Sequence, residues 1–267
     1  MSGEVAAEIR TSHILDLAAS GKRLDGRGAD EYRSVSIAPG YIVTADGSAL
    51  VRLGDTVVAC GVKLELGKPF PDTPNAGVLT TNAELVPLSS PTFEPGPPQP
   101  GAIEVSRVVD RAIRAAEAID LTRLCVTPGE KTWVCYVDIH VLDHSGNLID
   151  AAMLAGVAAL AHATVPAKRF GVAETDYPLD LQHLPVECTF VRLGDTIVVD
   201  PTFDEEQAAQ GRLTIATDEL GRVVAMQKGL VGAFSPDDVR SLVTRALAHG
   251  ERLRAAARGG TSMSKRT

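Results

Sequence analysis

The 267-residue sequence lacks closely spaced cysteines, long apolar runs and an excess of positive charge. Its four cysteines form no CxxC pair and sit mostly in apolar, strand-like segments, so we expect reduced core residues. No segment approaches the roughly 20 apolar residues that cross a bilayer. Glu4 and Glu8 also interrupt the region where a signal peptide needs an apolar core. These absences predict a cytoplasmic protein without membrane contact.

The net charge of −8 excludes a protein that coats nucleic acid through its overall charge, so any RNA contact needs a local basic cluster. Familiar motifs are also missing: the sequence has no Walker-type glycine loop, no GxGxxG, no GxSxG and no HExxH. With 45% hydrophobic and 22% charged residues, the chain has an ordinary globular composition and room for one large or two small cores.

An internal repeat organises the chain. The string VRLGDT at 51–56 recurs at 191–196, followed both times by apolar β residues, which suggests two copies of one supersecondary unit. In each half, strands come first and helices later, which predicts an α+β fold with mixed, largely antiparallel sheets. We expect an N-terminal helical extension (1–24), two domains (25–180 and 181–257) and a disordered tail (258–267).

Residue patterns predict the main elements. Helices are predicted at 4–20, 103–119, 150–163 (capped by Asp150) and from Ser235 onward. Strands are predicted within 32–66, at 131–142 and within 213–226. Residues 91–101 contain five prolines and two glycines, so we expect a surface loop there.

The helix after this loop carries arginines opposite its apolar stripe. Arg107, Arg111 and Arg114 share that side, because residues three and four apart are neighbours on a helix. They could form an ordinary solvated face, with Glu104 and Asp110 as helpful neighbours, or they could bind phosphates. Taken alone, the pattern favours the solvated face.

Two other charged clusters leave alternatives open. Arginines 23, 27 and 33 surround a tight Asp-Gly turn. They could bind a carboxylate of the same chain or a phosphate, and the sequence favours both interpretations equally. The acids at 200 and 204–206 could perform acid or metal chemistry, but a solvated turn is the favoured interpretation. A metal site at His140 and His144 is disfavoured, because these residues straddle a strand end and a turn. We predict no metal.

The sequence resembles the RNase PH family. The resemblance rests on RLDGR at 23–27 with Arg33 and on GSALVRLGDT at 47–56, and it extends from about Gly21 to Leu253. It implies two RNase PH-like domains of the ribosomal protein S5 domain 2-like type. Four further strings resemble the non-catalytic ring subunits of the archaeal exosome: FEPGPP at 93–98, RVVDR at 107–111, GEKTWV at 129–134 and DPT at 200–202.

That resemblance implies a hetero-hexameric ring, a trimer of heterodimers with a catalytic RNase PH-like subunit, which RNA-binding cap proteins complete. The complex would degrade single-stranded RNA from its 3′ end by phosphorolysis, and this chain would need no cofactor. In the family, two arginines that match Arg107 and Arg111 bind the RNA backbone.

Catalysis is where the chain departs from the catalytic members. Their phosphate-binding arginine matches Leu148, which cannot supply a charged bidentate contact. Their two aspartates match Asp200 and Glu206, and the longer glutamate displaces its acid. The resemblance therefore implies no catalytic residue here, and the alternative is an active phosphorolytic exoribonuclease that forms a homo-hexamer.

Overall fold

The computed structural model describes residues 2–259, with side chains from residue 7 onward. Its first sheet has the strand order β1-β2-β3-β6-β4, with β5 paired to β6. All neighbours in this sheet are antiparallel except β4 and β6, which run parallel. The strands are β1 (Val35–Pro39), β2 (Gly47–Leu53), β3 (Thr56–Gly67), β4 (Val78–Leu85), β5 (Cys125–Thr127) and β6 (Lys131–Asp143).

The second sheet is antiparallel throughout and has the order β10-β9-β11-β12. Its strands are β9 (Val186–Leu193), β10 (Thr196–Val199), β11 (Gly211–Thr217) and β12 (Val223–Gly229). A small pair, β7 (Thr164–Val165) and β8 (Tyr177–Pro178), lies between the sheets in the sequence. The helical elements are α1 (Ser2–Ala19), α2 (Pro100–Ala115), η1 (Leu121–Leu124), α3 (Leu148–Ala161), α4 (Phe203–Ala208) and α5 (Pro236–Gly259).

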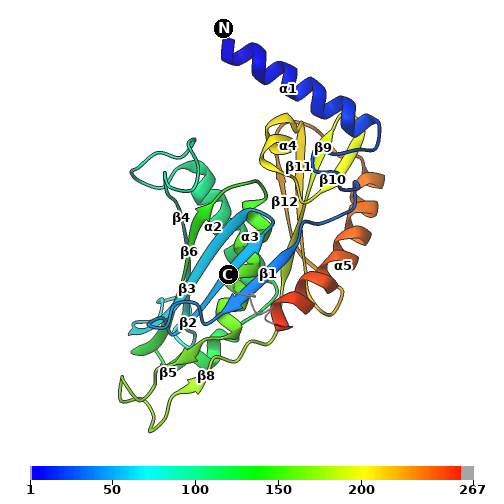
Figure 1. Ribbon diagram of the computed structural model, residues 1–267. Coiled ribbons are helices and arrows are strands. Elements are labelled where there is room, and N and C mark those ends of the chain that lie inside the picture. Colours follow the sequence, from blue (N-terminus) through cyan, green and yellow to red (C-terminus); the bar gives the residue numbers. More distant parts are fainter. Residues whose placement is uncertain (1, 260–267) are drawn as a thin grey trace.

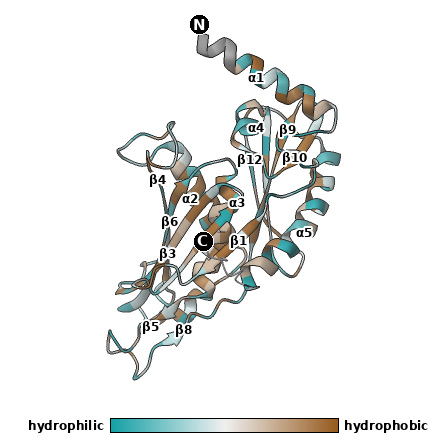
Figure 2. Cartoon of the chain, in the orientation of Figure 1, coloured by the Kyte–Doolittle hydropathy of each residue, from teal (hydrophilic) through white to brown (hydrophobic). Residues whose placement is uncertain are grey.

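The helices and sheets form alternating layers (Figure 1). α3 packs on β2 and β3 of the first sheet and on β9 of the second. Every residue from 148 to 160 is buried, as expected for a helix that is apolar all round. α5 covers the other face of β9, because Thr189 bonds to α3 while Cys188 contacts α5. Figure 2 shows hydrophobic residues along the strands of both sheets, where they meet these helices.

The repeated string forms equivalent hairpins in the two sheets, which confirms the prediction from the repeat. Leu53 pairs with Thr56 between β2 and β3, and Leu193 pairs with Thr196 between β9 and β10. The glycine of each turn has a positive φ, +58° at Gly54 and +62° at Gly194. Glycine adopts this conformation without steric cost, so the same turn chemistry recurs.

Several predicted elements agree with the structure. The N-terminal helix, the 32–66 meander, the strand at 131–142 and the strand pair within 213–226 are all present. The last helix begins as predicted: the Ser235 hydroxyl accepts from the Asp238 N–H at 3.1 Å, and the Asp238 carboxylate accepts from the Ser235 N–H at 2.8 Å. This reciprocal cap satisfies two backbone donors. The predicted domain boundaries stay predictions.

Some predictions were wrong. α2 begins at Pro100, inside the predicted loop, because proline is tolerated in the first turn of a helix. Asp150 does not cap α3: the N-cap is Asn147, and Asp150 is buried three residues further along the chain. The tail prediction fails at residues 258 and 259, which belong to α5, and residues 260–267 lie outside the described part. Across residues 2–259, no helix is both long and apolar enough to cross a membrane.

Candidate functional site

Asp200 lies just after β10, fully buried, and its carboxylate is saturated with hydrogen bonds. Arg33 donates its Nε (2.9 Å), Nη2 (2.7 Å) and backbone N (2.9 Å), while Arg27 Nη1 (2.9 Å) and Asn147 Nδ2 (2.7 Å) complete the set. Burial alone would raise the pKa of Asp200, but the bonds and charge of Arg33 hold that pKa below its usual value. A carboxylate has about four lone-pair positions, so these donors leave none for a ligand.

A second buried acid, Glu205, is held in the same way by Arg23. Two guanidinium nitrogens of Arg23 lie 2.7 and 2.6 Å from the two carboxylate oxygens, and the side chains are 1% and 2% exposed. Arg23, Arg27 and Arg33 therefore bind carboxylates of their own chain. Of the two alternatives that the sequence left open, the structure shows carboxylate bracing and not a phosphate clamp. The solvated-turn interpretation was wrong for Asp200 and Glu205.

The loop before α3 touches the backbone before α4. An added side chain at Gly146, where φ is +96°, would come within 2.4 Å of the Phe203 nitrogen, so only glycine permits this approach. The contact brings the start of α3 to Glu206, whose Oε1 accepts from the Asn147 N–H at 2.9 Å. Burial raises the pKa of Glu206 to about 7. Its carboxyl group thus sits at the N-terminus of α3, where exposed N–H groups favour an anion.

Leu148 opens α3 and is 9% exposed. It lines a cavity of about 260 Å³ together with Phe93, His144, Glu206 and Arg212. Burial, with a smaller effect from Arg33, lowers the pKa of His144 to about 4, so its imidazole is neutral at pH 7. Arg212 is paired with Glu104. The cavity therefore offers no unpaired cation among the residues that line it.

Asp200, Glu206 and Leu148, the positions that the resemblance alone matches to the catalytic members, thus lie together around the start of α3. Asn147 joins them, because it contacts both Asp200 and Glu206. No local pattern predicts these two contacts of Asn147, since Asp200 and Glu206 lie more than fifty residues further along the chain. Within residues 2–259, no cluster of three or more His, Cys, Asp or Glu side chains is arranged to hold a metal.

The second feature is the row of arginines on α2. The apolar stripe is buried as predicted, and Arg107, Arg111 and Arg114 are exposed on the other side. They line a groove of about 710 Å³, whose opposite wall includes Thr80 and Thr81 of β4. The groove and the cavity at Leu148 are separate hollows that share no lining residue, although α2 contributes to both.

The acids on α2 do not neutralise Arg107 and Arg111. Glu104 is bonded to Arg212. Asp110 accepts from Arg114 Nε at 2.7 Å and from the Thr81 hydroxyl at 3.1 Å. Arg111 donates to the neutral amide of Gln227 on β12 at 2.9 Å. In the described part of the chain, Arg107 has no hydrogen-bond or ion-pair partner, so Arg107 and Arg111 present positive charge that no acid of α2 compensates.

Comparison with known proteins agrees with this fold. Residues 31–166 match the 3′ exoribonuclease family, domain 1, and residues 183–248 match its domain 2. The exosome complex component Rrp42 of Thermococcus kodakarensis is 48% identical over 94% of this chain and 95% of that protein. The Rrp42 of Thermoplasma acidophilum is 50% identical over 95% of this chain and 96% of its own length.

A solved structure is also similar. The Archaeoglobus fulgidus exosome with RNA bound to the active site contains a chain that superposes with a TM-score of 0.91 at 47% identity. The match covers 94% of this chain and 98% of that one. Both domain matches and these relatives show that the chain belongs to the 3′ exoribonuclease, or RNase PH, family.

Proposed function

We propose that this chain is a non-catalytic ring subunit of an exosome. It forms a hetero-hexamer with a catalytic RNase PH-like partner, holds single-stranded RNA on Arg107 and Arg111, and completes the active site of the partner. Cap proteins that bind RNA complete the assembly, and the partner performs 3′–5′ phosphorolysis. Two observations support this proposal. Similar proteins are named exosome components, and a similar chain belongs to an exosome structure with bound RNA. A cytoplasmic location is part of the same proposal.

The proposal that this chain is not catalytic rests mainly on Asp200, whose carboxylate oxygens have all their lone pairs occupied by hydrogen bonds. An acid that binds a metal, takes a proton or orients a substrate must offer a lone pair at the reacting group. Here Arg27, Arg33 and Asn147 use all of them, and Arg33 alone provides three donors. Asp200 serves as a structural anchor between the N-terminal segment and the second sheet.

The place for an attacking phosphate is also filled. The Asn147 N–H at the start of α3 donates to Glu206, and the Gly146 N–H donates to His144 Nδ1 at 3.3 Å. A phosphate would have to displace the Glu206 carboxyl group, and Leu148 offers it no charge in return. The N-terminus of α3 therefore holds an acid of its own chain where a catalytic member needs to hold phosphate.

The RNA-holding role rests on the row of arginines. Exposed arginines beside acids are usually neutralised, but here Glu104 and Asp110 are bonded elsewhere. Arg107 and Arg111 lie one helical turn apart and face the same groove, so both guanidinium groups can bind phosphates of one strand.

The test is reconstitution with the catalytic partner, followed by measurement of mass and of phosphate-dependent release of nucleoside diphosphates. Alone, this chain should release none. In the complex, Glu206→Gln should leave activity unchanged, because the amide oxygen can still accept from Asn147. Replacing the matching acid of the partner by its amide should abolish activity.

Asp200→Ala is unsuitable for this test, because it would leave the Arg33 guanidinium buried without an acid and would remove one of the two acids that bind Arg27. The alternative function, an active homo-hexameric exoribonuclease, predicts a different outcome. A stable hexamer of this chain alone that releases nucleoside diphosphates would overturn the proposal.

A further inference from the structure

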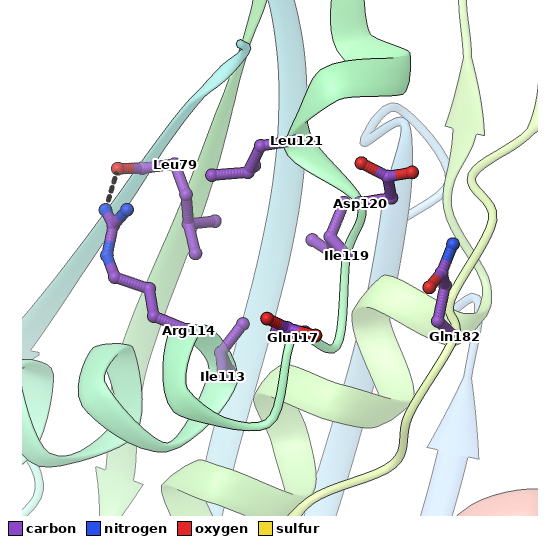
Figure 3. Close-up of a pocket in the computed structure, with 8 residues that line it drawn as sticks. All are labelled: Leu79, Ile113, Arg114, Glu117, Ile119, Asp120, Leu121 and Gln182. Carbon is purple, nitrogen blue, oxygen red and sulfur yellow. Dashed lines mark hydrogen bonds between the residues drawn. The ribbon is translucent and has the colours of Figure 1, made fainter. Parts of the chain in front are cut away.

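The groove with the arginines leads into a second hollow that the proposed function leaves unused. This base pocket, as we name it, has a volume of about 470 Å³ and apolar walls formed by Leu79, Ile113, Ile119 and Leu121 (Figure 3). Leu79 and Arg114 line both hollows. In Figure 3 the guanidinium of Arg114 bonds to the Leu79 carbonyl, at 2.5 Å, and so marks the point where the two meet.

The end of α2 places a strained glutamate at this pocket. The Ala118 N–H bonds to the Ile113 carbonyl and the Glu117 N–H bonds to the Arg114 carbonyl, each at 3.0 Å. This is the Schellman arrangement, in which the left-handed residue is usually glycine. Here it is Glu117, with φ of +53°. A side chain in this conformation costs stability, and such strain is typical of functional positions.

The polar groups of the base pocket are mostly acceptors. The Glu117 carboxylate is exposed and has no hydrogen-bond or ion-pair partner among the described side chains. Asp120 uses Oδ1 to accept from Thr122, from its N–H at 3.0 Å and its hydroxyl at 2.6 Å, which leaves Oδ2 open. Gln182 adds an amide at the edge, where its backbone N–H is bonded to the Ala118 carbonyl at 2.8 Å.

We infer that the base pocket receives one nucleobase of the RNA whose phosphates lie on Arg107 and Arg111, and that it favours bases with an exocyclic amino group. The inference rests on the proposed function and extends it to base preference. The apolar walls suit the flat faces of a base, and carboxylate acceptors suit the amino groups of adenine, cytosine and guanine. Uracil has no such group. Carboxylates repel phosphates, so Glu117 and Asp120 keep the backbone on the arginine side.

The experiment uses the reconstituted complex in phosphate-free buffer, so that RNA binds without being degraded. Fluorescence anisotropy measures the affinity for oligo(A), oligo(U) and oligo(A) with one abasic ribose at successive positions. An abasic ribose at the position that reaches the pocket should weaken binding about fivefold, because the apolar contact between the base and the aliphatic walls is lost. Abasic sites further from the 3′ end should have little effect.

The sharpest variant is Glu117→Gly, because a structural and a functional role predict different results. Glycine relieves the left-handed strain, so the melting temperature should rise by about 2 °C. Affinity for oligo(A) should nevertheless fall, while affinity for oligo(U) should not fall, because uracil has no amino group to lose a contact. Glu117→Gln, which keeps the side-chain size, should reduce the same preference. Leu220→Ala, at an exposed apolar residue in the turn between β11 and β12, is the matched control and should change neither affinity.

The outcomes distinguish failure of the base pocket from failure of the proposed function. If the Arg107→Ala, Arg111→Ala double variant loses affinity but Glu117→Gly keeps the oligo(A) to oligo(U) ratio, the base pocket is wrong and the proposed function stands. If the double variant keeps wild-type affinity, both fall. If the Glu117 variants change the mass of the complex instead of the ratio, the pocket holds a cationic side chain of a protein partner, and the inference is overturned.

Discussion

Two groups of arginines in this chain are used in opposite ways. Arg23, Arg27 and Arg33 are 1%, 9% and 10% exposed, and each binds a buried carboxylate of the second half of the chain. Arg107 and Arg111 are exposed on α2, and the acids beside them are bonded elsewhere. Whether an arginine stabilises the fold or stays available for a ligand thus depends on whether a nearby acid binds that arginine or another residue.

The first group offers the largest expected effect. Asp200→Ala removes the acid that binds Arg33 and one of the two acids that bind Arg27, and it leaves the Arg33 charge buried, so the free energy of unfolding should fall by about 3–5 kcal/mol. For a chain of this size the melting temperature should drop by about 10 °C. Asp195→Ala, at an exposed acid in the nearby turn, is the control and should cost less than about 0.5 kcal/mol. Equal melting temperatures for both variants would contradict the bracing role.

The second group should behave in the opposite way. The Arg107→Ala, Arg111→Ala double variant should keep wild-type melting, because neither side chain packs in the core. Its plot of log affinity against log salt should lose about 1.4 units of slope, at about 0.7 per phosphate contact on single-stranded RNA. The loss should be similar for all RNA sequences.

The matched control is the Arg240→Ala, Arg252→Ala double variant, which removes two exposed arginines of α5. It should leave the slope unchanged. Parallel plots for the Arg107 and Arg111 variant and the wild type would return these arginines to an ordinary solvated face.

The comparison also shows what could be predicted from the sequence. The apolar stripe of α2 and the repeated turns depend on neighbours a few residues away, so their periodicity is visible in the sequence. The bracing of Asp200 depends on Arg33 and Asn147, which lie 167 and 53 residues away in the chain. Such pairs leave no local pattern, so the acid cluster looked like a solvated turn. For the same reason Asp150 looked like a helix cap, although its carboxylate bonds to Thr189 on β9.

A smaller effect should distinguish Glu206 from the saturated Asp200. Its pKa is raised from 4.5 to about 7 by burial, so the folded state holds a proton that the unfolded state releases. The resulting stabilisation is complete below pH 4.5 and is lost as the pH rises through 7. Glu206→Gln removes this dependence, so relative to wild type the variant should gain about 2–3 kcal/mol of stability between pH 5 and pH 8.

Denaturant unfolding at several pH values measures this difference. The Asp150 carboxyl group, whose pKa burial raises to about 6, titrates in both proteins and cancels in the comparison. Curves that stay parallel from pH 5 to pH 8 would show that Glu206 is not a proton-holding acid.

The smallest effect concerns Arg114, which stands between the two groups because it is exposed but already holds an acid. Its Nε donates to Asp110 one turn away, and its Nη2 donates to the Leu79 carbonyl. Asp110→Asn removes the negative charge and keeps an acceptor for the Thr81 hydroxyl, so stability should fall by no more than about 0.5 kcal/mol. The freed charge of Arg114 should then contribute to RNA binding, and the salt slope should steepen by up to about 0.7 units. Adding Arg114→Ala to Asp110→Asn should abolish this gain, because the positive charge at position 114 is then gone. The double-mutant cycle measures the coupling between the two residues. If the slope of Asp110→Asn equals that of the wild type, Arg114 belongs with the bracing arginines, and only Arg107 and Arg111 bind RNA.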